Sequence, residues 1–449
     1  MDKLLIILCF MASVGMIVLV FPDGIVALAL VLILSAAALF IFRKFTDEKQ
    51  FVTQVFLLAL LLRIGVGIML HVFDLRDFFG ADATTYDYRG SRLLDFWTGT
   101  TTEDPNRVAH MTGSGWGMHY LVAFLYLVFG KNIFLAQSFC AVFGAATAPA
   151  VYYCARKIFQ NLNVAKTSAL AIAAFPSFVI WSGQLMKDGL IIFLLVVAIT
   201  MVLQLQERFN YAALVVLILS LGGIISLRFY IFYMVAMAVV GSFIIGISKS
   251  TQSILTRSAI LIIMGVGLTY LGVIRNAGTD LDTYANLERI QVSRSDLANP
   301  AESGFGADLD VSTTEGALAA VPVGFVYLMF APFPWEAANF RQAITIPEVL
   351  LWWAMIPLML AGILYAIKHR LRSAFPILIF SLTLALAYSI FQGNVGTAYR
   401  QRTQIQVFLF IFIAVGWTIY KERREDKKND RINKRKEFER KLRGRNKFE

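Results

Sequence analysis

Residues 187–206 read KDGLIIFLLVVAITMVLQLQ, and this stretch decides the fold class. The apolar run after the first two residues is about as long as an α-helix that crosses a bilayer, roughly 20 residues. Backbone groups in lipid have no water to bind, so such a segment must be helical. The composition agrees, because 58% of the residues are hydrophobic and only 16% are charged.

Eleven further stretches have a similar length and character. They lie at about 4–21, 24–42, 52–73, 131–155, 167–183, 210–227, 229–248, 254–274, 347–367, 373–391 and 403–420. We therefore expect an all-α polytopic membrane protein with about 12 transmembrane helices.

Basic residues in short connections predict the orientation, because they concentrate on the cytoplasmic side of a membrane. If the C-terminal tail is inside, all the basic short loops fall on that side: Arg43, Lys44, Lys49, Arg156, Lys157, Lys166, Arg208, Lys249, Arg257, Lys368, Arg370 and Arg372. The long connections 74–130 and 275–346 then lie outside. This arrangement predicts a multi-pass protein of the cell (plasma or inner) membrane, with both termini in the cytoplasm.

The predicted orientation requires that two apolar stretches do not span. Residues 117–130 are too short, and residues 321–335 contain three prolines. We expect both to be interfacial or re-entrant helices.

The transmembrane domain then covers 1–420, followed by a basic cytoplasmic tail over 421–449 with 14 Lys/Arg and seven Asp/Glu. The tail carries no nucleic-acid recognition motif, so we expect membrane lipids and not nucleic acid as its surroundings.

The polar interruption from Asp74 to Gly117 is far longer than a turn between spans requires. A helix over 81–97 would place Asp82, Tyr86 and Arg89 on one face, with Asp82 in the first turn. Its other face, with Leu93, Leu94, Phe96 and Trp97, would press into the bilayer. The sequence leaves two interpretations open: a catalytic carboxylate at the membrane edge, or an aspartate capping a surface helix.

Further charges lie at the outer ends of predicted spans, where ionisable groups are costly and usually face a partner or a site. Lys187 and Asp188 begin one span, and Arg228 separates two others. Asp188 could simply pair with Lys187, and Arg228 could extend toward the headgroups. Between the last two spans, a glycine-containing turn over 392–402 carries Tyr399, Arg400 and Arg402. Arginine suits phosphate oxygens, so these residues are predicted to bind substrate.

The order of these features resembles the glycosyltransferase C superfamily, and within it the mannosyl- and aminoarabinosyl-transferase-like group. The resemblance covers roughly residues 52–260. It rests on the acidic first outer loop, the short interfacial helix, and the motifs at Ala155–Phe159, Phe175-Pro176, Ser182-Gly183 and Lys187-Asp188.

The resemblance implies that Asp82 and Asp188 are the catalytic acids of two outer loops. Adjacent acids are common in the first loop of this superfamily, whereas Ala83 follows Asp82 here. Asp77 and Asp87 therefore remain alternatives to Asp82. No metal ligands are assigned, and a divalent metal ion is an optional cofactor.

The chemistry that follows is transfer of a sugar from a polyprenyl-phosphate-linked donor, with inversion, at the extracytoplasmic face. Asp82 would act as the base, and Tyr86, Arg89, Lys187, Arg228, Tyr399, Arg400 and Arg402 would bind substrate. The acceptor would be a glycan, lipid or protein in cell-envelope or exopolysaccharide assembly. Two alternatives stay open: a polysaccharide polymerase, which would tolerate loss of Asp82 but not of Arg400 or Arg402, and a transporter or flippase for lipid-linked sugars.

Overall fold

The structure is a computed structural model of the 449-residue chain. It describes residues 2–80, 82–103, 115–245, 262, 265–266, 286–298, 303–306, 309–337 and 339–445. Helices make up these parts of the chain, which contain no strand and a single isolated bridge between Gly304 and Asn394. The all-α polytopic fold predicted from the sequence is confirmed, since eight helices among the described residues are long and apolar enough to cross a membrane.

The helices follow one another along the chain with these bounds: α1 (Asp2–Leu19), α2 (Asp23–Lys44), α3 (Lys49–Val72), α4 (Arg76–Phe79), α5 (Asp82–Trp97), α7 (Trp116–Phe129), α8 (Ile133–Phe159), α9 (Leu162–Ala174), α10 (Pro176–Ser182), α11 (Lys187–Glu207), α12 (Tyr211–Ile245), α15 (Leu287–Ala298), α16 (Thr314–Phe330), α17 (Phe340–Ala343), α18 (Ile346–His369), α19 (Leu371–Phe391) and α20 (Val395–Arg445). A short 3-10 turn (η1, Pro334–Glu336) precedes α17.

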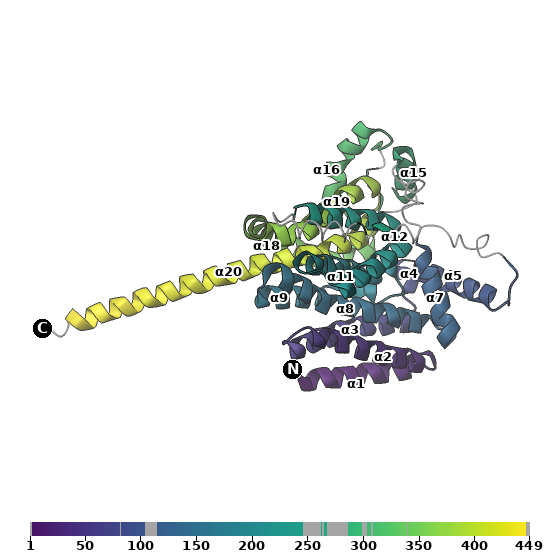
Figure 1. The fold of residues 1–449 in the computed structure, drawn as a ribbon, viewed down its shortest axis with the longest axis horizontal. Helices are drawn as coiled ribbons and strands as arrows, with labels where there is room; N and C mark the ends of the chain where they lie inside the picture. The colour runs from purple at the N-terminus through teal and green to yellow at the C-terminus, as the bar shows by residue number, and fades with distance from the viewer. Residues whose placement is uncertain are drawn as a thin grey trace.

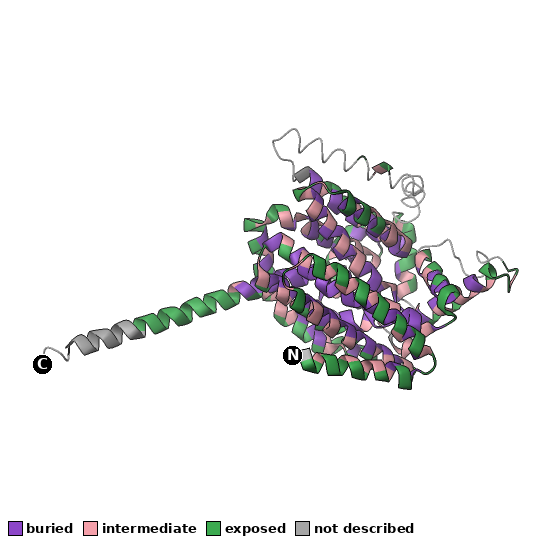
Figure 2. Ribbon diagram, turned by 60° about the horizontal axis from the view of Figure 1, so that its bottom comes forward, coloured by how far each residue is buried: buried purple, intermediate pink, exposed green. Residues whose placement is uncertain are grey.

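The long helices run side by side, and α8 and α11 lie inside the bundle (Figure 1). Alanine is frequent in α8, and such small side chains let α2, α3, α9 and α11 approach it closely. In contrast, α1 and α2 form an outer layer with many exposed apolar side chains (Figure 2). Such an apolar exterior is what a bilayer covers.

Helix α12 is a hairpin of two helices joined at Arg228, where the backbone leaves helical geometry. The first half of α12 starts beside the C-terminal end of α11 and runs back to its N-terminal end, where Arg228 contacts Asp188. The second half returns to the C-terminal end of α11, where the Ser242 carbonyl accepts a 3.0 Å hydrogen bond from Gln206 Nε2. The chain therefore reverses at Arg228, as the predicted spans 210–227 and 229–248 require. The predicted span 254–274 lies almost wholly outside the described residues, so the count of about twelve stays a prediction.

The predicted span 167–183 is broken into α9 and α10, which meet at 55°. Pro176 has no N–H to donate to Ile172, so the break leaves carbonyl groups unsatisfied inside the bundle. Arg63 of α3 compensates for this, because its Nη2 and Nη1 donate to the carbonyls of Ile172 (3.3 Å) and Ala173 (3.1 Å). A fully buried arginine thus stabilises the bend that aims α10 at the end of α11.

Two shorter apolar helices, α7 and α16, match the stretches predicted to be interfacial. Their lengths of 14 and 17 residues are below the span length. Of the three prolines expected to interrupt 321–335, Pro322 does not, because α16 continues through it and ends at Phe330, before Pro332 and Pro334. The predicted lipid-facing surface of α5 is also wrong in part. Leu93 and Leu94 are buried, and Leu93 packs against Ala123 of α7, although Phe96 and Trp97 remain exposed.

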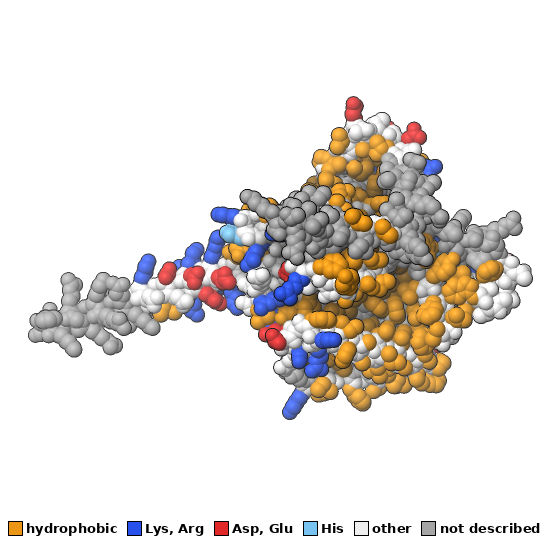
Figure 3. Space-filling view, in the orientation of Figure 1, with side chains coloured by type: hydrophobic (Ala, Val, Ile, Leu, Met, Phe, Trp, Pro, Cys, Tyr) orange, Lys and Arg blue, Asp and Glu red, His pale blue; other side chains and the backbone are white. Residues whose placement is uncertain are grey.

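Lysine and arginine side chains gather at the end of the bundle where α20 leaves it (Figure 3). Ion pairs between Lys157 and Glu207 (2.6 Å) and between Lys166 and Glu48 (2.7 Å) lie at this end. Helix α20 continues past residue 420 into the predicted tail without a break, and its side chains are exposed over 421–434. The orientation of the two termini stays a prediction.

Candidate functional site

The end of the bundle opposite the basic loops carries a buried cluster of charges contributed by four helices. Arg400 near the start of α20 is its centre: Nη1 lies 2.6 Å from Asp82 Oδ2 of α5, and Nε lies 2.9 Å from Asp188 Oδ2 of α11. Arg228, at the α12 reversal, approaches Asp188 Oδ1 at 3.5 Å. Four of the predicted site residues from separate parts of the sequence are therefore in direct contact.

Asp188 is fully buried and sits between two arginines. Its contacts with Arg228 Nη1 and Arg400 Nε are ion pairs whose alignment falls outside hydrogen-bond geometry. Gln404, one helical turn after Arg400, adds a hydrogen bond from Nε2 to Asp188 Oδ1 at 3.3 Å, and its own Oε1 accepts from Tyr388 at 2.6 Å. Asp188 therefore lies where it can hold the two guanidinium groups in place, and its role as a second catalytic acid stays a prediction.

Asp82 differs from Asp188 in its access to solvent, because its side chain is 44% exposed whereas that of Asp188 is 0% exposed. It occupies the first turn of α5 as predicted. Helix α5 is held against α7 at Gly90, where a Cβ atom would come within 2.4 Å of Val122 Cγ1. Asp82 is therefore the carboxylate of the cluster that an incoming hydroxyl group can reach.

Tyr86 lies one turn after Asp82, is buried, and packs its ring 5.7 Å from that of His119 on α7. Burial, followed by the nearby negative charge of Asp82, raises the pKa of Tyr86, so its hydroxyl stays protonated and can donate. His119 is buried with Nδ1 unpartnered among the described residues. Burial and the neighbouring Arg89 and Lys187 lower the pKa of His119 to about 4.

Two further predicted residues, Lys187 and Arg89, lie near His119 and form no ion pair in the described part of the chain. Lys187 is half-buried beside Gly115, where an added Cβ atom would lie 2.9 Å from the ammonium nitrogen. Arg89 is half-buried on α5. Together with Arg228 and Arg400 these cations number four, against the two carboxylates of Asp82 and Asp188. The excess positive charge suits an anionic ligand.

The two remaining predicted residues, Tyr399 and Arg402, lie outside the cluster. The expected turn over 392–402 is wrong, because α20 already begins at Val395. Residues two positions apart in an α-helix differ by about 200° around the helix axis, so Arg402 cannot face the same way as Arg400. Its fully buried guanidinium instead donates from Nη1 to the carbonyls of Met329 (3.0 Å) and Ala331 (2.9 Å). Tyr399 contacts Ser177 of α10.

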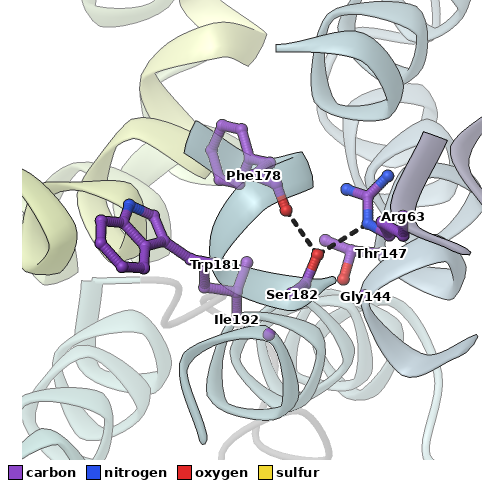
Figure 4. Close-up of a pocket in the computed structure, with 8 residues that line it drawn as sticks. Arg63, Gly144, Thr147, Phe178, Trp181, Ser182 and Ile192 are labelled. Atoms are coloured by element: carbon purple, nitrogen blue, oxygen red, sulfur yellow. Dashed lines mark hydrogen bonds between the residues drawn. The ribbon is translucent and has the colours of Figure 1, made fainter. Parts of the chain in front are cut away.

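A small cavity lies beneath the cluster, on the side of α10. It is lined by Arg63, Gly144, Thr147, Phe178, Trp181, Ser182, Gly189 and Ile192, and its volume of about 10 Å³ is the room that one water molecule needs. Figure 4 shows two of its lining residues, Arg63 and Ser182, joined by a hydrogen bond in which Arg63 Nε donates to Ser182 Oγ at 2.7 Å. Trp181 lies under Arg400, whose guanidinium carbon is 5.9 Å from the ring centre.

Sequence reasoning missed Gln404, Tyr388 and Trp181. The sequence does contain a signal for Gln404, because a residue four positions after Arg400 lies on the same helix face as Arg400. Trp181 had none, since a tryptophan near a membrane boundary is ordinarily an interfacial anchor. Among the described residues, no group of three or more His, Cys, Asp or Glu side chains could hold a metal ion.

Residues 115–273 match the family described as dolichyl-phosphate-mannose-protein mannosyltransferase. A crystal structure of ArnT from Cupriavidus metallidurans bound to undecaprenyl phosphate is similar to this chain, with a TM-score of 0.48 and 14% identity. The similarity covers 79% of this chain and 59% of that one, so the chain spans about three fifths of that protein's length. No curated protein sequence matches the chain. The family match over residues 115–273 lies largely within the part of the chain, roughly 52–260, on which the predicted resemblance mainly rests, and it supports that resemblance.

Proposed function

We propose that the protein transfers a sugar from a polyprenyl-phosphate-linked donor to an acceptor hydroxyl group at the extracytoplasmic face of a cell membrane. The observation that carries this proposal is the bridge from Asp82 through Arg400 to Asp188, which combines a reachable carboxylate with buried cations at one end of a membrane bundle. The family match over 115–273, which includes Lys187, Asp188 and Arg228, supports the same chemistry.

In the proposed reaction the Asp82 carboxylate accepts the proton of the acceptor hydroxyl group. The acceptor oxygen forms a bond to the anomeric carbon as the bond from that carbon to the phosphate oxygen breaks. The bonding electrons leave with the polyprenyl phosphate, whose negative charge Arg400, Arg228 and Lys187 stabilise. Displacement in one step inverts the anomeric centre. Arg89 and Tyr86 lie where they can hold the donor or the acceptor.

Donor binding would also prepare the base. In this structure Asp82 is paired with Arg400. A donor phosphate that binds Arg400 competes for the same guanidinium group and releases the Asp82 carboxylate to accept a proton. The buried Asp188 keeps Arg400 in place meanwhile, because it contacts Nε, a different nitrogen from the Nη1 that binds Asp82. This division of contacts gives the two carboxylates separate roles.

The test is transfer by the purified protein, with a panel of polyprenyl-phosphate sugars and an extract of envelope glycans as acceptors. Asp82→Asn is expected to reduce transfer by about a hundredfold or more while the protein stays folded, since a positioned base contributes on that order. Asp95→Asn is the matched control, because Asp95 is an acid of the same helix that pairs with Lys131 away from the cluster. Wild-type turnover in Asp82→Asn, or equal losses in both variants, would refute the assignment.

A further inference from the structure

A buried carboxylate that the proposed reaction does not use lies beside the cluster. Glu348 is in the first turn of α18 and only 7% exposed. Among the described residues it forms no ion pair. A carboxylate in such surroundings is costly unless hydrogen-bond donors satisfy it. The donors that satisfy Glu348 therefore indicate what it holds together.

Ser177 and Tyr399 supply these donors. Ser177 Oγ donates to Glu348 Oε1 and lies 3.1 Å from the Tyr399 hydroxyl oxygen. A serine hydroxyl group has a single hydrogen, so Ser177 cannot donate to both partners. The Tyr399 hydroxyl group also forms a hydrogen bond with Glu348, so its own hydrogen can be donated to Glu348 or to Ser177 Oγ. Glu348, Ser177 and Tyr399 therefore form one hydrogen-bonded chain of side chains, which joins α18, α10 and α20.

The same three helices position the central arginine of the site. Tyr399 immediately precedes Arg400, and α10 supplies both Ser177 and Trp181, the ring beneath Arg400. Trp181, Tyr399, Met186 and Val349, the neighbour of Glu348, form one small buried apolar cluster. Arg402 stacks on the Tyr399 ring from the next turn, 5.0 Å from its centre. Tyr399 is thus held at its hydroxyl group and on its ring.

We propose that Glu348 is a positioning residue, which acts through Ser177 and Tyr399 to fix the start of α20 so that Arg400 reaches both Asp82 and Asp188. The consequence for the reaction rests on the proposed function, because a displaced Arg400 would bind the donor phosphate less well. Glu348 itself touches neither Asp82 nor Asp188 and takes no part in proton transfer.

The experiment compares Glu348→Ala with Glu348→Gln in the full-length protein. Alanine removes the acceptor of the chain, and we expect the KM for a polyprenyl-phosphate sugar to rise about tenfold, the effect of one hydrogen bond to a charged group. Glutamine keeps an acceptor oxygen for Ser177 and should return KM to within about threefold of wild type. Tyr399→Phe should reproduce the alanine effect, and combining it with Glu348→Ala should add little, because both break one chain.

Met359→Ala is the matched control, since Met359 is a buried residue of α18 about three turns beyond Glu348. It should lower thermal stability without raising KM. Equal KM changes in Met359→Ala and Glu348→Ala, or no rescue by glutamine, would overturn the positioning role.

A measurement that needs no activity separates this inference from the proposed function. Amide hydrogen exchange over 395–402 should accelerate in Glu348→Ala and in Tyr399→Phe but not in Glu348→Gln. If the wild-type protein transfers no sugar and exchange still follows this pattern, the proposed function fails and the positioning role stands. Unchanged exchange in Glu348→Ala would overturn the positioning role whatever the activity.

Discussion

Arg400 Nη1 lies 2.6 Å from Asp82 Oδ2, although 318 positions separate the two residues in the chain. This contact joins α5, a helix of the long polar interruption, to α20, the last membrane helix. Because Arg400 also contacts Asp188, one side chain connects an exposed carboxylate with a buried one. The two acids are therefore expected to respond differently to the same substitution.

Asp188→Asn should destabilise the protein more than Asp82→Asn does. Removing the charge of Asp188 leaves Arg228 and Arg400 buried without their shared counter-ion, and breaking a buried pair costs about 3–5 kcal/mol. The half-exposed pair of Asp82 with Arg400 contributes about 0–1 kcal/mol. Denaturant titration of both variants in detergent measures the difference between their free energies of unfolding. Equal destabilisation would show that burial does not separate their roles.

Arg400→Lys should lose most of the proposed activity, although it keeps the positive charge. An ammonium group is a single point, whereas the guanidinium group presents Nη1 to Asp82 and Nε to Asp188 at once. We expect kcat/KM to fall about tenfold or more, the effect of one lost charge-assisted contact. Steady-state kinetics with a polyprenyl-phosphate sugar measures this. Activity close to wild type would mean that charge alone suffices.

The convergence of these charges can be predicted only in part from the sequence. Hydrophobic runs indicate where each helix enters and leaves the membrane, so the sequence predicts one depth, at the outer membrane boundary, for Asp82, Asp188, Arg228 and Arg400. Their lateral meeting depends on how α5, α11, α12 and α20 pack, and no pattern within a single helix encodes that. Arg402 shows the limit most clearly. Its exclusion from the cluster follows from the helix beginning at Val395, whereas two glycines favour a turn there.

The structural roles of Glu348 and Arg63 could not be predicted from the sequence for a related reason. Each lies within an apolar run long enough to resemble an ordinary span, and each is satisfied by groups distant in sequence. Two partners of Arg63 are the carbonyl groups of Ile172 and Ala173 at the proline break between α9 and α10, and the bend there is not evident from the sequence. A lone charge inside a span is a useful signal. It does not reveal which residues satisfy the charge.

Gly90→Ala should impair the proposed activity by moving α5. A methyl group at Gly90 would lie 2.4 Å from Cγ1 and 2.7 Å from Cβ of the buried Val122, so α5 and α7 would have to separate. Such overpacking costs about 1–3 kcal/mol. It would also displace Asp82, two turns earlier on α5. Gly65→Ala is the control, because a Cβ atom there meets nothing within 4 Å. A loss of transfer in both variants would argue against the close contact.

His119 should make the fold sensitive to mild acid. Burial, together with Arg89 and Lys187, lowers its pKa from 6.5 to about 4 in the folded protein. The unfolded chain therefore binds a proton more readily, and the stabilising contribution is complete above pH 6.5 and declines as the pH falls toward 4. The difference between the two pKa values limits this loss to at most about 3 kcal/mol at pH 4.

The measurement is the free energy of unfolding in detergent at several pH values between 7 and 4.5, for wild type and for His119→Asn. Asparagine cannot be protonated, so the variant should be less stable than wild type at pH 7 but show a shallower decline in acid. The carboxylates of the cluster contribute equally to both proteins and cancel in the comparison. Parallel curves for the two proteins would mean that His119 is not the group responsible.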